Sequence, residues 1–357
     1  MTKHEEISRW LREKIADGTF AVDSRILSEN KLAALFSCSR QTVRQAIGSL
    51  ETDGIVARTQ GSGTFVCRRD ARVRQAATMR IGVITTYLDD YIFPGIIQGI
   101  EQILSARHYS MVLGITHNRQ TDEENAMRQL LENGIDGLII EGTKTALPNV
   151  NELLFQEFCD HGIPVVFLNS CHRGCSAARV VMDDILAGEL AANALICENH
   201  TQLGGIFKSD DLQGLHRYEG MQRAVKQAGL PFSDASVLWY TTEDIPYLFR
   251  GSFDTMILSR FEHITGLVCY NDQIAAPLIR MLQKYGKHVP EDCSIVSFDN
   301  SALAQNIACG LTSVTYPAEE IGRQAASLLL KKLEDPSCCE QIVFRPEIRI
   351  RSSVRTI

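Results

Sequence analysis

From Arg80 to the C-terminus, short apolar runs rich in β-branched residues alternate with segments of helical periodicity. This alternation is typical of parallel sheets whose strands are joined by helices. The runs fall into two successive sets, so we expect two doubly wound α/β lobes. The first set is Ile81–Thr85, Met111–Ile115, Gly137–Ile140 and Val165–Leu168, with helices expected near 94–107, 121–133 and 150–161. The second set is Leu203–Lys208, Val237–Tyr240, Gly266–Cys269 and Cys293–Phe298.

Ligands of such sheets bind beyond the carboxyl ends of the strands, and two paired lobes place that crevice between them. Acids, amides, cations and aromatic residues follow the expected strands or lie on the next helix. The candidate ligand-binding residues among them are Tyr87, Asp90, Tyr91, Phe93, Glu141, Lys144, Asp183, Lys208, Arg217, Asn271, Asp272 and Asp299. Other polar residues that follow the same strands are Asp89, Asn169, Asp210 and Asp211.

These side chains suit a small ligand with many hydroxyl groups. Each sugar hydroxyl both donates and accepts a hydrogen bond, so carboxylates and cationic side chains pair with it. Aromatic rings cover the C–H faces of the same sugar. For each residue taken alone, a helix cap or a surface charge is the alternative, and this alternative stays open above all for Asp183 and Asp272. The pattern predicts a cleft for a polyol and does not identify the sugar.

The N-terminal part of the chain has a different pattern. Apolar residues at helical spacing predict a helix near 5–17. Ser28 and Ser39 are candidate N-caps of two further helices, the second of which runs to about Asp53. Two β-prone stretches around a glycine-rich turn follow over 55–66. The segment therefore predicts a helix-turn-helix followed by a hairpin, which is a winged helix.

In a winged helix the third helix enters the major groove of DNA, and the wing lies along the backbone or the minor groove. Arg and Gln at the start of that helix can pair with guanine and adenine edges, while Thr and Arg suit phosphates. An ordinary exposed helix face or a plain turn is the alternative for each residue. The candidate DNA-contacting residues are Lys3, Glu29, Arg40, Gln41, Thr42, Arg44, Gln60, Gly61, Ser62 and Gly63.

Charge is divided unevenly along the chain. Residues 1–80 carry 14 Lys and Arg against 9 Asp and Glu, and the remainder carries 22 against 34. A basic head suits contact with phosphates, because neutralising them releases counterions. The arginine-rich segment 69–79 is expected to be a solvated linker, with a hinge helix in the minor groove as the alternative. The expected domains are 1–68 for DNA binding and 80–357 for ligand binding and dimerisation.

The sequence disfavours several other classes of protein. It contains no run of about 18 apolar residues. The charged start of the chain lacks the apolar segment of a signal peptide, so we expect a cytoplasmic protein without membrane contact. The 11 cysteines, among them Cys171, Cys175 and the Cys338–Cys339 pair, lack a second cluster at metal-ligand spacing. We therefore expect no metal and no cofactor, and no nucleophile elbow or phosphate-binding loop indicates an enzyme.

The head resembles the GntR-type winged helix from end to end. The residues that carry this resemblance are Ser28-Glu29-Asn30, the run from Ser39 to Ile47, and Gly61-Ser62-Gly63-Thr64-Phe65-Val66. The resemblance implies that Glu29, Arg40 and the wing tip from Gln60 to Gly63 contact DNA. Leu27 stands where the family usually has Pro, which affects the turn into the second helix and leaves the contact surface intact.

The body resembles the effector domain of LacI/GalR regulators and of periplasmic sugar-binding proteins. The residues that carry this resemblance are Cys269-Tyr270-Asn271-Asp272, the run from Val289 to Asn300, and Leu311-Thr312-Ser313-Val314. The resemblance implies that Arg217, Asn271, Asp272 and Asp299 contact the ligand. Ser297 stands where the family usually has Gly.

A GntR-type head on a LacI-type body is an uncommon combination, and it resembles the AraR-type arabinose repressors. The stretches typical of that group are Thr85-Thr86-Tyr87, Glu141-Gly142-Thr143-Lys144 and Gly205 to Gly214. The resemblance implies a repressor that L-arabinose releases from operator DNA, and we expect it to bind as a homodimer. The alternatives are a regulator of the same architecture that senses another sugar or a nucleoside, a sugar-processing enzyme, or a transport-associated binding protein.

Overall fold

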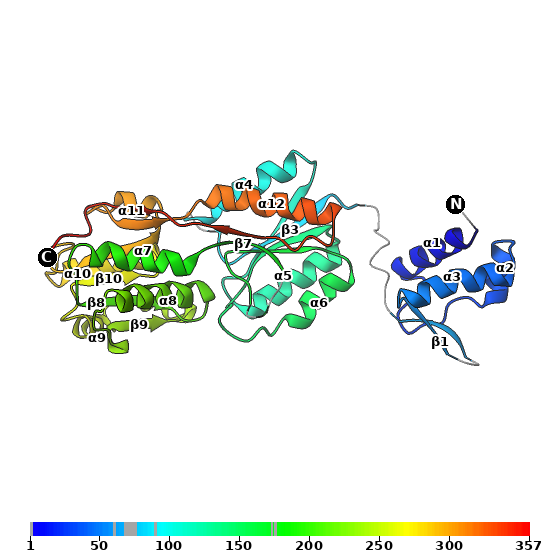
Figure 1. Cartoon of the computed structure of the whole chain (residues 1–357), viewed down its shortest axis with the longest axis horizontal. Helices are drawn as coiled ribbons and strands as arrows, with labels where there is room; N and C mark the ends of the chain where they lie inside the picture. The colour runs from blue at the N-terminus through cyan, green and yellow to red at the C-terminus, as the bar shows by residue number, and fades with distance from the viewer. Residues whose placement is uncertain (1–2, 60–61, 68–76, 89–90, 173, 175–176) are drawn as a thin grey trace.

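The computed structural model describes residues 3–59, 62–67, 77–88, 91–172, 174 and 177–357. Outside these ranges lie the predicted sites Gln60, Gly61 and Asp90, together with Asp89, Cys175 and most of the predicted linker 69–79. The described residues form a small helical head with a hairpin and a larger body with two six-stranded sheets (Figure 1). The predicted fold class, a winged helix followed by a two-lobed domain with parallel sheets, is confirmed.

The head consists, in its described residues, of three helices and a hairpin around one apolar core. Its elements are α1 (Lys3–Ala16), α2 (Glu29–Leu35), α3 (Arg40–Thr52), β1 (Val56–Thr59) and β2 (Gly63–Val66). The hydroxyls of Ser28 and Ser39 accept hydrogen bonds from main-chain N–H groups of α2 and α3, which confirms both predicted N-caps. The two strands pair antiparallel. Apolar side chains of all three helices and the hairpin share one buried cluster, which fixes the position of α3.

The first lobe of the body is built on a parallel sheet with the strand order β13-β7-β6-β5-β3-β4. Its strands are β3 (Arg80–Thr85), β4 (Ser110–Ile115), β5 (Gly137–Glu141), β6 (Val165–Leu168), β7 (Ala178–Met182) and β13 (Gln341–Phe344). Its helices are α4 (Phe93–Ser105), α5 (Gln120–Asn133), α6 (Glu152–Asp160) and α12 (Ala318–Glu334). Helices α4 and α12 cover one face, and α5 and α6 cover the other, so the central strands β3, β5 and β6 are buried on both faces.

The second lobe is built on a sheet with the order β14-β12-β11-β10-β8-β9, in which β14 is antiparallel. Its strands are β8 (Leu203–Lys208), β9 (Val237–Tyr240), β10 (Gly266–Cys269), β11 (Ser294–Asp299), β12 (Thr312–Thr315) and β14 (Ile348–Arg349). Its helices are α7 (Asp184–Ile196), α8 (Leu212–Gln227), α9 (Asp254–Arg260), α10 (Asp272–Lys284) and α11 (Ala302–Asn306), with 3-10 turns at Asp234–Ser236 and Thr242–Asp244. Helices α7 and α8 cover one face, and α9 and α10 the other.

The sequence predicted that each lobe is formed by one continuous part of the chain, and this prediction is wrong. The chain passes between the lobes after β7, after β12 and after β13, so α12 and β13 complete the first lobe from the far end of the sequence. Helix α12 lies beside α4 (Figure 1). A Cβ atom on Gly99 would lie 2.0 Å from the Glu319 carbonyl oxygen, and one on Gly322 would lie 2.1 Å from that of Ile96. The two glycines therefore allow this close helix contact.

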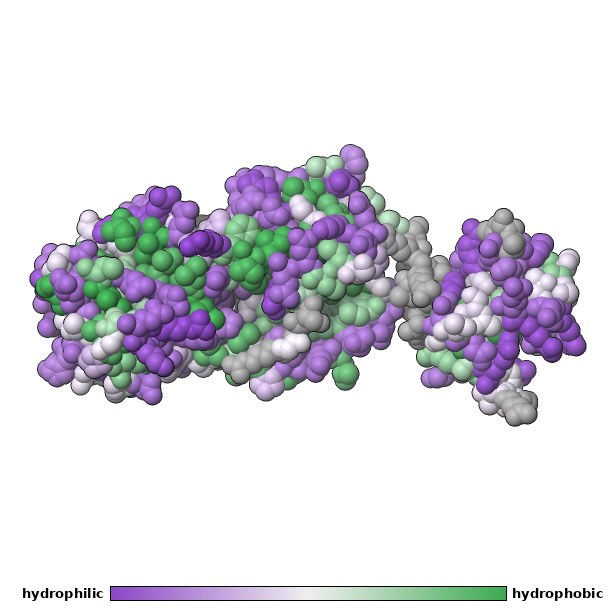
Figure 2. Space-filling view, in the orientation of Figure 1, coloured by the Kyte–Doolittle hydropathy of each residue, from purple (hydrophilic) through white to green (hydrophobic). Residues whose placement is uncertain are grey.

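The surfaces of the two parts differ in character. Figure 2 shows patches of hydrophobic residues on the body, whereas the same face of the head is mainly hydrophilic. Within the described ranges, no helix combines the length and the apolar character needed to cross a bilayer.

Candidate functional site

A cavity of about 890 Å³ lies between the two lobes, at the carboxyl ends of their parallel strands. This is the position where open α/β sheets bind ligands. The predicted ligand-binding residues that line it are Tyr87, Tyr91, Phe93, Glu141, Lys208, Arg217, Asn271 and Asp299. The structure thus brings residues separated by more than half of the chain to one cleft.

Arg217 of α8 is the central cation of the cleft, and only 3 % of it is exposed. Its Nε donates to Asp184 Oδ1 at 2.9 Å, its Nη1 donates to the main-chain oxygen of Tyr270 at 2.6 Å, and its Nη2 lies 3.7 Å from Asp299 Oδ1. Burial alone would lower the pKa of Arg217, but the two carboxylates raise it above its ordinary value. The guanidinium is therefore charged and held in one orientation.

Tyr91 links the two lobes across the cleft. Its hydroxyl, from the first lobe, donates to Asp299 Oδ2 at the end of β11 in the second lobe. Burial raises the pKa of Asp299 by more than Arg217 lowers it. Burial also raises the pKa of Tyr91 well above its usual value, so the hydroxyl remains a donor at neutral pH. This contact closes one side of the cleft around the Asp299 carboxylate.

Glu141 ends β5 and supplies the carboxylate of the first lobe. Thr86 donates to its Oε2 from both the main-chain N–H at 2.9 Å and the hydroxyl, and Asn169 donates to its Oε1 from Nδ2 at 2.5 Å. The hydroxyl of Tyr316, which follows β12 on a segment that crosses between the lobes, donates to Asn169 Oδ1. Burial raises the pKa of Glu141. The carboxylate is thus fixed by neutral donors rather than by a salt bridge.

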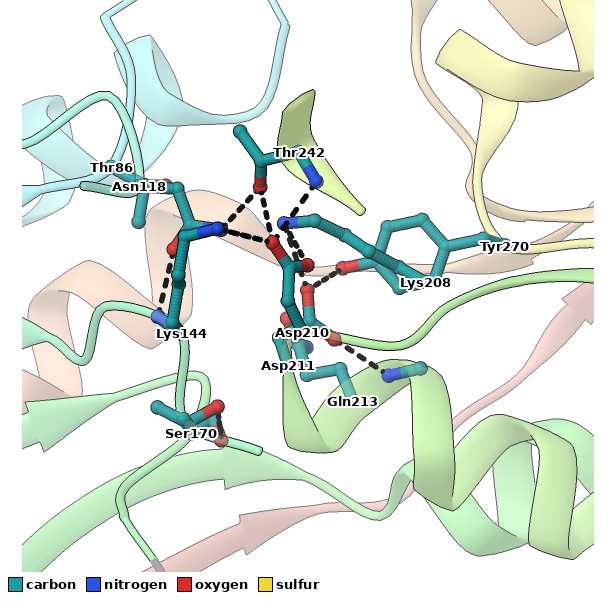
Figure 3. Close-up of polar contacts among 12 residues, drawn as sticks. Thr86, Asn118, Lys144, Ser170, Lys208, Asp210, Asp211, Gln213, Thr242 and Tyr270 are labelled. Carbon is teal, nitrogen blue, oxygen red and sulfur yellow. Dashed lines mark hydrogen bonds and ion pairs between the residues drawn. The ribbon is translucent and has the colours of Figure 1, made fainter. Parts of the chain in front are cut away.

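Lys208 ends β8 and supplies a second buried cation (Figure 3). Its Nζ lies 3.2 Å from Asp211 Oδ2 and 3.5 Å from Asp210 Oδ1. The hydroxyl of Tyr270 donates to the same Asp211 oxygen at 2.7 Å. Burial alone would lower the pKa of Lys208, but the two carboxylates raise it above its ordinary value. The second lobe therefore offers a charged ammonium group to the cleft.

Aromatic side chains form part of the cleft wall. The rings of Tyr87 and Phe93 are tilted against each other with centroids 6.2 Å apart, and both line the cavity. Asn271 lines the cavity from the second lobe. Its side chain also accepts a hydrogen bond from the main chain of α10 and caps that helix. Apolar rings and fixed polar groups together are the combination that a sugar requires.

Lys144 does not line the cavity but joins the two lobes beside it (Figure 3). Its Nζ donates to Asp210 Oδ2 at 3.2 Å and to Glu243 Oε1 at 2.7 Å. Next to it, Asn118 of the first lobe donates from Nδ2 to the hydroxyl of Thr242 in the second lobe at 2.6 Å. Asp210 also accepts from the Thr242 hydroxyl at 2.7 Å. We call these five residues the inter-lobe bridge.

Two predicted ligand-binding residues, Asp183 and Asp272, do not line the cavity. Asp183 accepts a hydrogen bond from the main chain of α7 and caps that helix. Asp272 is fully buried and accepts from the hydroxyls of Ser301 and Ser313. Burial and the nearby Asp299 carboxylate raise the pKa of Asp272 to about 6. Asp90 lies outside the described residues.

Several residues of the cleft were missed from the sequence. Tyr240, Tyr270 and Tyr316 line the cavity, and each ends or directly follows a strand, which is the signal that could have identified the first two. Asp184, which holds Arg217, follows β7, a strand that the sequence analysis did not identify. Asn118 follows β4 by three residues and was also not selected.

The head presents its predicted DNA-contacting residues around the start of α3. Arg40 and Gln41 are exposed in its first turn, and Thr42 shares a hydrogen bond of 2.9 Å with the capping hydroxyl of Ser39. Arg44 is exposed and donates from Nε to Glu29 Oε2 at 2.9 Å, which ties α3 to α2. Exposed arginine side chains on a recognition helix suit a phosphate backbone.

The remaining predicted contacts lie at the wing and at the chain start. Ser62 is exposed before β2, and Gly63 has a φ of +121°, where a Cβ atom would meet the Arg25 side chain at 2.3 Å. Lys3 at the start of α1 pairs with Glu6 at 3.0 Å. The wing-tip residues Gln60 and Gly61 lie outside the described residues.

Both parts of the chain match models of known protein families. Residues 3–66 match the bacterial regulatory proteins of the gntR family, and residues 192–354 match the periplasmic binding protein-like domain. Among solved structures, the complex of the transcriptional regulator CelR with cellobiose has a TM-score of 0.68 at 20 % identity and covers 92 % of this chain and 100 % of that one. The transcription regulator CcpA of Lactococcus lactis has a TM-score of 0.68 at 26 % identity, covering 77 % of this chain and 99 % of that one.

Two curated relatives match over nearly the whole chain. The arabinose metabolism transcriptional repressor of Geobacillus stearothermophilus is 37 % identical over 99 % of this chain and 96 % of its own length. The protein of the same name from Halalkalibacterium halodurans is 34 % identical over the same shares. With a gntR-type head, a two-lobed body and this agreement along its length, the chain belongs to the family of arabinose metabolism transcriptional repressors.

Proposed function

We propose that this repressor holds operator DNA with its head and releases it when L-arabinose occupies the cleft between the lobes. The observation that carries the proposal is the cavity of about 890 Å³, which is lined by the Glu141 carboxylate of the first lobe and by the fixed charged groups Lys208, Arg217 and Asp299 of the second. The names of the two full-length relatives support arabinose as the sugar. Because those relatives are regulators of transcription, we assign no catalytic step to the cleft. For the same reason we propose that the protein acts in the cytoplasm.

The sugar hydroxyls would be recognised by groups already fixed in orientation. Glu141 and Asp299 supply acceptors, and Lys208 and Arg217 supply donors that stay charged at neutral pH. Pre-oriented groups lose little conformational entropy when the sugar binds, which favours affinity. The sugar contacts that we propose are Tyr87, Asp90, Tyr91, Phe93, Glu141, Lys208, Arg217, Asn271 and Asp299.

Three predicted residues would act on the sugar indirectly. Lys144 holds the lobes together through the inter-lobe bridge, and Asp183 and Asp272 position the starts of α7 and α10 and the loop after β11. A sugar that touches both lobes favours the closed arrangement, because only that arrangement offers it both sets of contacts. The bridge adds to the stability of the same arrangement.

For DNA, we propose that residues 1–68 form the binding domain, 69–79 the linker, and 80–357 the effector-binding and dimerisation domain. Helix α3 would enter the major groove, where Arg40 and Gln41 reach base edges. The other DNA contacts would come from Lys3, Glu29, Thr42, Arg44 and the wing residues Gln60, Gly61, Ser62 and Gly63, with Thr42 and Arg44 placed for phosphates. A homodimer formed by the bodies would place two heads on the two half-sites of the operator.

Closure would then change how the two bodies meet and thereby the spacing of the heads on a pseudo-palindromic operator. A coupling free energy of about 2–3 kcal/mol between sugar and operator corresponds to roughly 30- to 150-fold weaker DNA binding in the presence of the sugar. The coupling is reciprocal, so operator DNA weakens sugar binding by the same factor.

Calorimetric titration of the full chain with L-arabinose, xylose, ribose and galactose tests the identity of the ligand. We expect saturable binding of L-arabinose and at least tenfold weaker binding of the other three, which corresponds to about 1.4 kcal/mol. A response to another of these sugars with silence toward L-arabinose contradicts the assigned sugar. Operator release in a DNA-binding assay with the same sugars tests the assigned function.

A further inference from the structure

The cavity between the lobes is larger than a single pentose requires. Its volume of about 890 Å³ lies near the upper end of the range of about 300–1,000 Å³ that is typical of pockets for drug-sized ligands. The buried charged groups around Arg217 and Asp299 occupy its inner end. The wall also includes exposed residues of the second lobe, which belong to the opening of the cleft.

Helix α10 shows how far the cavity extends. Asn271 at its start, Gln273, Pro277 and Arg280 all line the same cavity. The nine steps along the chain from Asn271 to Arg280 correspond to about 13 Å along the helix axis. Asn271 is buried and Arg280 is exposed, so the cavity runs from the interior to the surface along this helix. One end is beside the inner polar groups, and the other end lies clear of them.

The segment after β9 supplies an apolar and aromatic part of the same wall. Ile245 and Tyr247 line the cavity while 40 % and 62 % of each is exposed to solvent. Leu248 is buried in the core of the second lobe, which anchors the segment. Phe249 adopts a φ of +58°, an uncommon backbone conformation for a bulky residue, and also lines the cavity. An exposed Tyr held on an anchored segment offers a flat ring to a ligand.

Two arginines accompany these rings. Arg250 and Arg280 line the cavity and are exposed, and their side chains make no hydrogen bond or ion pair with any residue in the described ranges. Their donors are free to pair with the hydroxyl oxygens of a ligand. We call Ile245, Tyr247, Phe249, Arg250, Pro277 and Arg280 the outer branch of the cavity.

We propose that the outer branch binds a second sugar unit, glycosidically linked to the pentose in the inner cleft, so that the repressor accepts a pentose disaccharide. This proposal rests on the proposed function, because the first unit occupies the same inner site. Rings and proline faces cover the C–H surface of a sugar, while the arginine donors pair with its hydroxyls. A compact anion such as phosphate would use the arginines alone and gain nothing from the apolar wall.

The test compares L-arabinobiose with L-arabinose by calorimetry on the full chain and on variants of the outer branch. Tyr247→Ala and Arg280→Ala alter exposed side chains, so the fold should be retained. Each is expected to weaken arabinobiose binding about 3- to 10-fold, the size of one ring or hydrogen-bond contact, and to leave L-arabinose affinity unchanged. Arg223→Ala on α8, which pairs with Glu219 and does not line the cavity, is the matched control and should change neither affinity.

The outcomes separate this proposal from the proposed function. Binding of L-arabinose without binding of arabinobiose overturns the second sugar site and leaves the pentose sensor intact. Equal loss of both sugars in Tyr247→Ala also overturns it, because the ring would then serve the first unit. Binding of inorganic phosphate that Arg280→Ala removes, with no response to arabinobiose, would assign the outer branch to anions instead. Arabinobiose binding without L-arabinose binding would support the outer branch and contradict the assigned monosaccharide.

Discussion

Nζ of Lys144 in the first lobe donates to Asp210 Oδ2 in the second lobe at 3.2 Å, so a cation of one lobe is paired with an acid of the other. The side chain of Asp210 is only 2 % exposed, and that of Lys144 is 12 % exposed. Glu243 shares the same ammonium group. Because these residues contact each other only when the lobes are close together, their contacts favour the closed arrangement.

Replacing Lys144 by Met should therefore weaken sugar binding without removing a sugar contact. Hydrogen bonds to charged groups contribute about 1.5–3 kcal/mol, and we expect roughly a tenfold loss of L-arabinose affinity. The loss should lie in the dissociation rate, since the bridge acts after the sugar has bound. Stopped-flow measurement of both rates tests this. Lys226→Met, at an exposed lysine of α8, is the control, and a slower association in Lys144→Met with normal dissociation would contradict the assigned role.

Arg217→Ala should give a repressor that binds operator DNA and does not respond to the sugar. The change removes the guanidinium that lies between Asp184 and Asp299 and leaves two buried acids without their cation, so it should also cost about 3–5 kcal/mol of stability. Tyr91→Phe, which removes one hydroxyl, is the milder companion and should weaken sugar binding in a folded protein. Normal sugar-induced release from DNA by Arg217→Ala would exclude Arg217 from the site.

In the head, Arg40→Ala should cost about 1–3 kcal/mol of operator binding and leave sugar affinity unchanged. The side chain is exposed in the first turn of α3, where a recognition helix reaches base edges. Fluorescence anisotropy with operator DNA and calorimetry with the sugar measure the two effects. Lys14→Ala, a change of charge on α1, serves as the control. Equal effects of the two substitutions on DNA binding would indicate a general charge effect rather than a base contact.

Asp272 should make the stability of the body depend on pH. Its pKa is raised to about 6 in the folded protein, so folding favours its protonated form. The stability that the protonated Asp272 contributes is fully present below the pKa of the unfolded chain near 3.8. It is lost as the pH rises through about 6. A shift of about two pKa units corresponds to about 3 kcal/mol. Asp272→Asn should be more stable than the parent chain at pH 7 and lose this advantage near pH 4, measured by thermal unfolding; an unchanged difference between the two pH values would contradict the shift.

Local patterns in the sequence predicted the parts of the fold that depend on neighbouring residues. The caps Ser28 and Ser39 lie directly before runs of helical periodicity, and the central strands β6 and β10 are continuous apolar runs because both faces are covered. The return of the chain to the first lobe after β12 was not predictable in this way. Helix α12 reads like any amphipathic helix, and its place beside α4 depends on the close approach of Gly99 to Glu319 and of Gly322 to Ile96, residues far apart in the sequence.

The candidate site shows the same division. Residues that end strands, such as Glu141, Lys208 and Asp299, were selected from the sequence. Once the strands of a parallel sheet are predicted, the residues at their carboxyl ends, where ligands bind, are predicted too. Tyr316 and Asp184 were missed because they follow β12 and β7, which were not among the predicted strands. The pairing of Lys144 with Asp210 depends on how the lobes meet, which no local pattern specifies.

The most direct test of the central claim is the affinity for L-arabinose measured by calorimetry with and without saturating operator DNA. If sugar and operator oppose each other through lobe closure, the operator should weaken sugar binding roughly 30- to 150-fold, the same factor by which the sugar weakens operator binding. An L-arabinose affinity that is identical in the presence and absence of operator DNA would contradict the coupling between the cleft and the head.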